Sequence, residues 1–173
     1  MEQLTITTLN KALIEAVEQR MERLRDDISQ NIVRTGKRAS GRTQASLKVQ
    51  TEGNSVALYG RPFFASLQYG SKPWSGATGN RMTFAGFREI IRQWVVDKGL
   101  RFGQAEEQDR TISAITASII RKGSRQYRTA TYTDVYDTLI AKAVQDISEM
   151  TSATAMTAVD VVINKWTRQS IRR

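Results

Sequence analysis

The first part of the chain is dominated by apolar residues that recur every three or four positions. Within residues 9–33 they form one stripe, which consists of Leu13, Val17, Met21, Leu24, Ile28 and Ile32. Charged and amide side chains occupy positions on the opposite side, as in an amphipathic helix with one apolar face. We therefore predict an N-terminal helix within residues 1–33 that packs on a core, with a contact to another subunit as the alternative use of that face.

A period of two replaces the helical period after residue 46. The alternating positions are Leu47, Val49, Thr51, Val56 and Leu58. Gly53-Asn54 lies between the two runs, and a glycine with an asparagine at such a place indicates a tight turn. We expect a β-hairpin at the centre of residues 34–72. The glycine- and serine-rich stretch 34–45 has no apolar periodicity and predicts a mobile or extended loop.

The remaining sequence predicts helices. Two are expected within residues 84–122, each followed by a glycine that favours a helix stop, Gly99 and Gly123. Helical spacing then continues over residues 134–170, where a stretch rich in threonine, serine and alanine at 151–158 leaves open one long helix or two in series.

These patterns predict a single α+β domain over residues 1–173, in which a small antiparallel sheet based on the hairpin is packed by helices. Residues 127–134 are rich in threonine and tyrosine and predict an extended link or a small edge strand. The chain is long enough to bury one core.

Cysteine and histidine are both absent from the sequence, and their absence removes many kinds of catalytic and metal-binding site. Disulfides, thiolate nucleophiles, imidazole bases and Cys/His zinc sites are excluded. The N-terminus lacks an early apolar run, and no stretch approaches the roughly 18 apolar residues of a membrane span. We expect a soluble protein made inside the cell, with no enzymatic activity, no cofactor and no metal.

Two groups of residues could indicate catalysis, but one has a structural explanation and the other lacks a residue that the chemistry requires. Glu106, Glu107 and Asp109 form the densest acidic cluster, but they stand where a predicted helix begins, and carboxylates favour the positive end of a helix dipole. The tyrosines after residue 126 would suit a tyrosine recombinase, but that chemistry also requires a histidine. We therefore assign no catalytic residue.

The net charge of +9 is concentrated in the middle of the chain. Residues 34–104 carry +9 by themselves, whereas residues 129–163 carry −4. The best candidates for contact with phosphate are the cations of the predicted loop, Arg34, Lys37, Arg38 and Arg42. An acidic neighbouring subunit would suit the same cations, and the sequence leaves both partners open.

Aromatic residues that follow the hairpin are candidates for a subunit interface: Phe63, Phe64, Tyr69 and Trp74. Trp74 lies in a loop, where a large aromatic side chain either finds a partner surface or packs back on its own domain.

Three short segments occur in an order that resembles a known family. Residues 40–46 read SGRTQAS before the first strand, residues 63–71 read FFASLQYGS after the hairpin, and residues 119–128 read IIRKGSRQYR at the end of a helix. In this order they resemble the minor virion proteins of tailed bacteriophages that are described as neck, tail-completion or head-tail joining proteins.

The resemblance implies a structural protein of the virion neck or tail, made in the cytoplasm of the host bacterium and without contact to a membrane. Its partners would be itself, as a homo-oligomeric ring of six or twelve copies, the portal or connector proteins, the tail-tube proteins and, transiently, the genomic DNA that passes through. If all the positive charge lined the channel, DNA would be held back by many phosphate contacts. We therefore expect most of the basic excess to face acidic neighbours, with only residues 34–42 near the bore.

The alternative is a soluble basic nucleic-acid-binding protein that uses residues 34–42. The calculated isoelectric point of about 10.2 is its main support.

Overall fold

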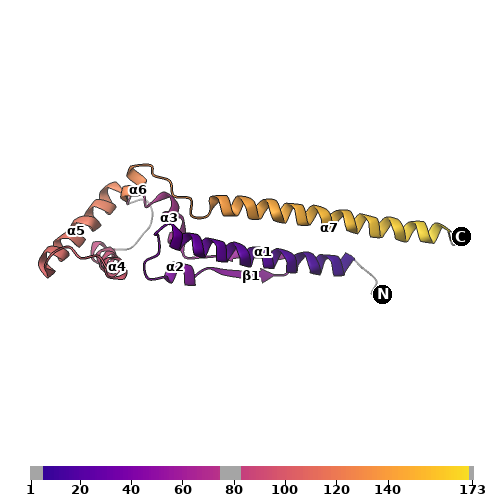
Figure 1. Cartoon of the computed structure of the whole chain (residues 1–173), viewed down its shortest axis with the longest axis horizontal. Coiled ribbons are helices and arrows are strands. Elements are labelled where there is room, and N and C mark those ends of the chain that lie inside the picture. The colour runs from indigo at the N-terminus through magenta and orange to yellow at the C-terminus, as the bar shows by residue number, and fades with distance from the viewer. Residues whose placement is uncertain (1–5, 75–82, 172–173) are drawn as a thin grey trace. The chain divides into compact units, whose positions relative to one another are not determined.

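The computed structural model describes residues 6–74 and 83–171, and it combines helices with one two-stranded antiparallel sheet (Figure 1). The elements in chain order are α1 (Ile6–Arg34), α2 (Arg42–Ala45), β1 (Lys48–Glu52), β2 (Ser55–Tyr59), η1 (Pro62–Ala65), α3 (Ser66–Tyr69), α4 (Phe84–Asp97), α5 (Ala105–Lys122), α6 (Arg125–Arg128) and α7 (Asp137–Ile171). The predicted α+β class, with a small antiparallel sheet and long terminal helices, is confirmed.

The chain forms two compact units, and each is built from separate stretches of sequence. Unit 1 comprises Met1–Gln30, Leu47–Tyr59 and Tyr136–Arg173. Unit 2 comprises Asn31–Ser46 and Gly60–Val135. Two compact units can belong to one domain or to two, so the single domain stays a prediction.

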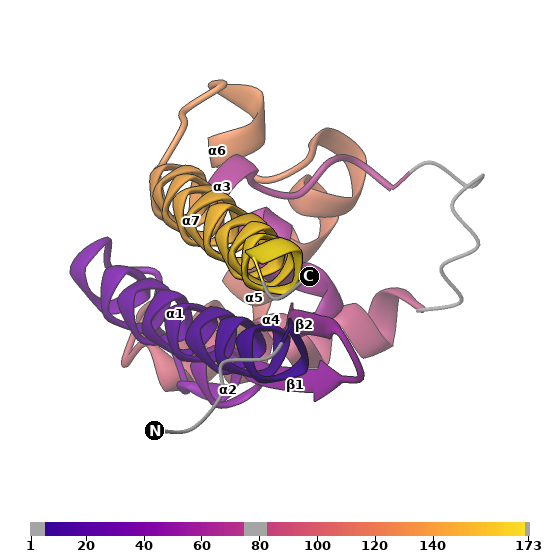
Figure 2. The ribbon, with the colours of Figure 1, turned by 90° about the vertical axis from the view of Figure 1, so that its right-hand side faces the viewer.

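In unit 1 the helix α1 runs beside both α7 and the hairpin, as Figures 1 and 2 show from two directions. Arg20 of α1 joins Asp146 of α7 through a contact of 2.7 Å between Nε and Oδ2. The hairpin turn Gly53-Asn54 lines a shallow depression together with the first turns of α1. Both observations place α1 next to α7 and next to the hairpin turn.

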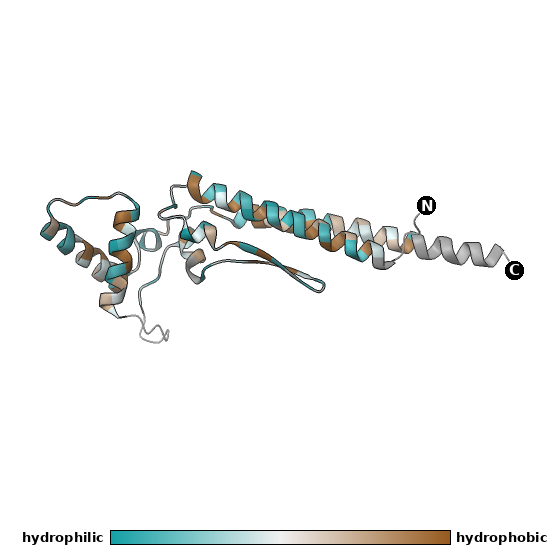
Figure 3. Ribbon diagram, turned by 90° about the horizontal axis from the view of Figure 1, so that it is seen from below, coloured by the Kyte–Doolittle hydropathy of each residue, from teal (hydrophilic) through white to brown (hydrophobic). Residues whose placement is uncertain are grey.

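The apolar stripe predicted for α1 is the side that the structure buries. Within unit 1, Leu24 and Ile28 are buried, as are Leu47 before β1 and Ala143 of α7. Figure 3 shows hydrophobic and hydrophilic positions alternating along α1 and α7. A helix of this length is stabilised mainly because its apolar face is buried, and less by the intrinsic helix propensity of its residues.

The hairpin has the predicted turn and strands. Its register pairs Lys48 with Tyr59 at the open end and Glu52 with Ser55 beside the turn. Gly53 has a φ of 56°, in the left-handed region that a tight hairpin turn requires.

In unit 2, α4 and α5 pack through a small apolar core. Ile91 and Val95 of α4 meet Ile112 of α5, and partly buried residues surround them: Phe87, Phe102, Ile115 and Ile119. Thr116 is also buried, and its hydroxyl donates to the carbonyl of Ile112 at 2.7 Å, so it brings no unsatisfied polar group into the core.

Two helices, α1 and α4, end within this unit in the same glycine motif. At the end of α1, the amide of Gly36 donates to Val33 and that of Lys37 to Ile32. At the end of α4, the amide of Gly99 donates to Val96 and that of Leu100 to Val95. Both glycines have positive φ, as the Schellman motif requires. The stop predicted at Gly99 is confirmed.

One local prediction is wrong for residues 42–45, and another is wrong in part. Residues 42–45 form the helical turn α2 in place of a mobile or extended loop, and the amide of Ala45 donates to the carbonyl of Gly41 at 3.0 Å. Residues 125–128 form the helical turn α6, which the prediction for 127–134 did not include, and this stretch pairs with no strand among the described residues, so the small edge strand is wrong. Residues 131–134 belong to no helix or strand, which agrees with the alternative of a link. The reason for the turn α6 is a cap, because the hydroxyl of Ser124 accepts a hydrogen bond from the amide of Tyr127.

The C-terminal segment is one continuous helix, α7, which settles the alternative that the sequence left open. The helix continues through the threonine-rich stretch, where three hydroxyls donate back to carbonyls one turn earlier: Thr151 to Ile147, Thr154 to Met150 and Thr157 to Ala153. None of the helices in the described ranges is long and apolar enough to cross a membrane.

Candidate functional site

The amide side chain of Gln126 joins three parts of unit 2 that lie far apart in the sequence. Its Oε1 accepts a hydrogen bond of 2.6 Å from Nζ of Lys37, in the loop after α1. Its Nε2 donates to the carbonyls of Leu67 and Gln68 in α3. One side chain of α6 therefore positions both the basic loop and the segment that follows the hairpin.

Two glycine-serine pairs form a second connection beside Gln126. The amide of Ser124 donates to the carbonyl of Ser71 at 2.8 Å, and the amide of Ser71 donates to the hydroxyl of Ser124 at 2.9 Å. Gly70 and Gly123 have φ of 75° and 78° with ψ of 177° and 173°, a conformation that is essentially restricted to glycine.

Side chains at these two glycines would also collide with their neighbours. A Cβ on Gly70 would lie 2.6 Å from the amide nitrogen of Tyr127, and one on Gly123 would lie 2.7 Å from the carbonyl oxygen of Ser71. The backbones therefore approach each other as closely as glycine allows. The two segments 63–71 and 119–128, singled out from the sequence, are thus bonded to each other.

Lys37 and Lys98 lie together at the end of α1. Nζ of Lys98 donates to the carbonyl of Gly36 at 2.7 Å, next to Lys37 in the chain. The pKa of Lys37 is lowered from its ordinary value, first because partial burial disfavours the charged ammonium and then because the charge of Lys98 repels it. Both lysines bond to neutral oxygens, so neither charge is cancelled by these partners.

The four cations predicted from the loop have different surroundings. Nε of Arg34 donates to Oδ1 of Asn31 at 3.0 Å, and Arg38 is exposed beside Gly41. Arg42 is the exception, because its Nη2 lies 3.1 Å from Oδ2 of Asp97 in an ion pair. Nζ of Lys37 donates to Oε1 of Gln126, as described above. Arg34 and Lys37 therefore bond to neutral amide groups, whereas Arg42 is tied to α4 by an ion pair.

The helix α6 adds cations that the sequence reasoning did not select. Arg125 and Arg128 are exposed on either side of Gln126 in the chain. We call six residues of unit 2 the basic cluster, because each lies within three chain positions of the Lys37–Gln126 or the Lys98–Gly36 hydrogen bond: Arg34, Lys37, Arg38, Lys98, Arg125 and Arg128. The mixture of basic and aromatic residues in RQYR could have identified the cations of α6 as candidates for the site. No local pattern could connect Lys98 with Gly36, which lies 62 positions away.

The aromatic residues predicted for an interface divide into exposed and packed ones. Tyr69 is exposed and its ring lies 6.0 Å from that of Tyr132, which is exposed as well. Trp74 is partly buried and packs on Phe87 of its own unit, with ring centroids 5.0 Å apart. Phe64 is partly buried, and the side chain of Phe63 lies outside the described part of the structure.

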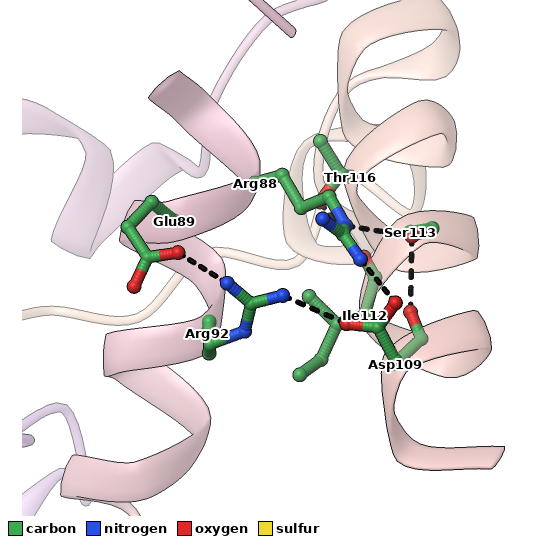
Figure 4. Close-up of polar contacts among 7 residues, drawn as sticks. All are labelled: Arg88, Glu89, Arg92, Asp109, Ile112, Ser113 and Thr116. Atoms are coloured by element: carbon green, nitrogen blue, oxygen red, sulfur yellow. Dashed lines mark hydrogen bonds and ion pairs between the residues drawn. The ribbon is translucent and has the colours of Figure 1, made fainter. Parts of the chain in front are cut away.

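The acidic cluster has the structural role that the sequence favoured. Glu106 and Glu107 lie in the first turn of α5, so their prediction as helix-start residues is confirmed. Asp109 accepts hydrogen bonds from Arg88 and, at 2.7 Å, from Nη2 of Arg92 on α4 (Figure 4).

Figure 4 also shows how α4 and α5 are fastened by this network. Nε of Arg88 donates to the hydroxyl of Ser113 at 2.8 Å, and Glu89 pairs with Arg92. The guanidinium groups of Arg92 and Arg88 hold the pKa of Asp109 below its ordinary value of 3.8. Among the residues the structure describes, no set of three or more acidic side chains is arranged to hold a metal ion.

Comparison with known proteins yields no matching family model, no matching curated protein and no matching solved structure. The function is therefore argued from the residues and their contacts.

Proposed function

We propose that this chain is a non-enzymatic structural protein of a tailed-phage virion, and that copies of it form part of a ring at the neck or tail end that joins tail to portal and lets DNA pass. The observation that carries the proposal is the bonded pair of segments 63–71 and 119–128. These segments carry the resemblance to neck and tail-completion proteins, and Ser71 and Ser124 join them through two hydrogen bonds.

A second support is the surface of α7, which offers apolar positions to a neighbouring copy. Val144 is 61% exposed and Met156 is 70% exposed, and Ile140 and Val159 are exposed on the same helix. Scattered apolar residues are normal on a surface, but four along one helix suit burial against another helix. A ring requires such a contact between different faces of successive copies.

The first test is the assembly state of the purified full chain. We expect closed rings in negative-stain electron microscopy and a matching mass by light scattering. A stable monomer at all accessible concentrations, in a protein also absent from purified phage particles, would contradict the proposal.

A matched pair of variants tests the role of α7. Val144→Lys places a charge among the exposed apolar positions and should weaken assembly while leaving the far-ultraviolet circular dichroism unchanged. Ala153→Lys adds a charge at an exposed position of α7 that lies, at about 100° per residue, outside the arc of the four apolar positions, and it should assemble as the wild type does. Equal assembly of both variants would exclude this face from the interface.

The alternative, a soluble basic nucleic-acid-binding protein, has one specific observation in its favour. Arg34 and Lys37 bond to neutral amide groups and keep their charge available for a phosphate. This alternative predicts nucleic-acid binding by a protein that stays monomeric and is not part of a particle.

A further inference from the structure

We propose that Lys37 and Lys98, flanked by Arg34, Arg38 and the two arginines of α6, bind consecutive phosphate groups of a nucleic-acid backbone. The inference concerns the chain by itself, and it holds whether or not copies assemble into a ring.

The two lysines are held in place by the fold. Gly36 has a φ of 68° within the Schellman motif, which directs its carbonyl toward Nζ of Lys98. Gln126 accepts a hydrogen bond from the ammonium group of Lys37 and donates its own amide to the carbonyls of Leu67 and Gln68. Anchoring of this kind reduces the side-chain entropy that a long lysine loses when it binds a ligand.

Among the described residues, neither lysine has a negatively charged partner at this site. An ammonium group has three donors, and a hydrogen bond to a neutral oxygen uses one of them without cancelling the charge. The repulsion between Lys37 and Lys98 disfavours two positive charges at this place in the absence of an anion. An anion bound across both groups would reverse this effect, because each positive charge would then gain an opposite charge nearby.

The composition of unit 2 favours phosphate over carboxylate as that anion. Its stretches contain 16 basic side chains, of which 12 are arginine, against 6 acidic ones. The planar guanidinium group matches phosphate oxygens in a bidentate manner, and arginine is enriched where phosphates are recognised.

The large net positive charge of unit 2 favours a polyanion over a second copy of this chain as its binding partner. Unit 2 has a net charge of +10, whereas unit 1 has a net charge of −1. Unit 1 of a neighbouring copy therefore cannot neutralise unit 2. A nucleic-acid duplex carries about one negative charge per 1.7 Å of its axis and can meet many of these cations at once.

The test measures binding of fluorescently labelled DNA oligonucleotides, single-stranded and double-stranded, to the purified full chain by anisotropy at several salt concentrations. We compare the wild type with Lys37→Gln/Lys98→Gln. Loss of two phosphate contacts should weaken binding by roughly tenfold at low salt and reduce the slope of log K against log salt by about 2. Circular dichroism and thermal melting establish that the variant is folded.

A control double variant removes the same charge from unit 1. Lys48→Gln/Lys142→Gln replaces two exposed lysines and should leave the slope unchanged. Equal losses in both double variants would show that only net charge matters and would overturn the assignment of the site.

Two further outcomes would overturn the inference. One is the absence of DNA binding by the wild type at low salt. The other is stronger competition by polyglutamate than by unlabelled DNA at equal charge concentration, which would identify an acidic protein as the partner. Ring assembly is scored separately by electron microscopy, so failure of this inference and failure of the proposed function are distinguishable.

Discussion

The two units of this molecule differ in net charge and in the length of their helices. Unit 1 is nearly neutral and consists of two long helices and a hairpin, with apolar residues of α7 left exposed. Unit 2 carries a net charge of +10 and consists of shorter helices joined by side-chain hydrogen bonds. The comparison suggests a division of labour, in which unit 1 supplies contacts to other copies and unit 2 supplies contacts to a polyanion. Four predictions test how differently the two units are built.

The largest effect is expected in the core of unit 2. Ile112 is 1% exposed between α4 and α5, so Ile112→Ala should lower the free energy of unfolding by about 2–5 kcal/mol, through lost burial and the cavity left behind. The control in unit 1 is Ile140→Ala, because Ile140 is 39% exposed. Urea denaturation measures both, and a loss in Ile140→Ala as large as that in Ile112→Ala would mean that α7 is buried in the isolated chain.

The next effect concerns the glycines. Gly123→Ala should destabilise unit 2 by roughly 3 kcal/mol, because the new Cβ meets the carbonyl of Ser71 and the backbone conformation is unfavourable for alanine. Gly53 in the hairpin of unit 1 also has positive φ but open space around it, so Gly53→Ala should cost only about 1 kcal/mol. Thermal melting of the two variants should separate them clearly, and equal costs would exclude the close approach in unit 2.

A smaller effect is expected for the ion pair of unit 1. Arg20 is nearly buried and Asp146 is partly exposed, so the double-mutant cycle of Arg20→Gln and Asp146→Asn should give a coupling of roughly 0.5–1 kcal/mol. A coupling of zero from urea denaturation would show that the pair does not hold α1 against α7.

The smallest effect is expected for the exposed network between α4 and α5. Because the pKa of Asp109 is lowered in the folded state, its carboxylate stabilises the protein at pH values above the ordinary pKa of 3.8. This contribution is lost as the pH falls through the lowered pKa. Asp109→Asn should therefore be less stable than the wild type at neutral pH, and the difference should shrink below pH 3.8. Glu106→Gln is the control, because Glu106 is highly exposed and its contact with Arg110 measures 4.0 Å. A difference that does not depend on pH would contradict the electrostatic explanation.

Most of the secondary structure could be predicted from the sequence, since it depends on local patterns. The stripe of α1, the turn at Gly53-Asn54 and the end of α4 at Gly99 all follow from residues a few positions apart. The errors at residues 42–45 and at α6 have the opposite cause. A helix of one turn has no apolar period to detect, and it depends on caps and on contacts with distant segments.

The candidate site could be predicted only in part. The loop cations Arg34, Lys37 and Arg38 were identified because basic residues in a glycine- and serine-rich stretch suggest an anion. Lys98 and Gln126 were missed, since their partners lie 62 and 89 positions away in the chain. Arg42 was included, although its ion pair with Asp97, 55 positions away, removes its charge from the site.

The sequence by itself determined the long helices, the hairpin and the exclusion of cysteine and histidine chemistry, because periodicity acts over several turns of helix and composition over the whole chain. The tertiary structure decided which charges lie together. Charge counted along the chain gives a basic middle, but folding separates Leu47–Tyr59 from that middle and adds Arg125 and Arg128 to it. The physical reason is that electrostatic and hydrogen-bond contacts depend on distance in space, which the order of residues does not contain.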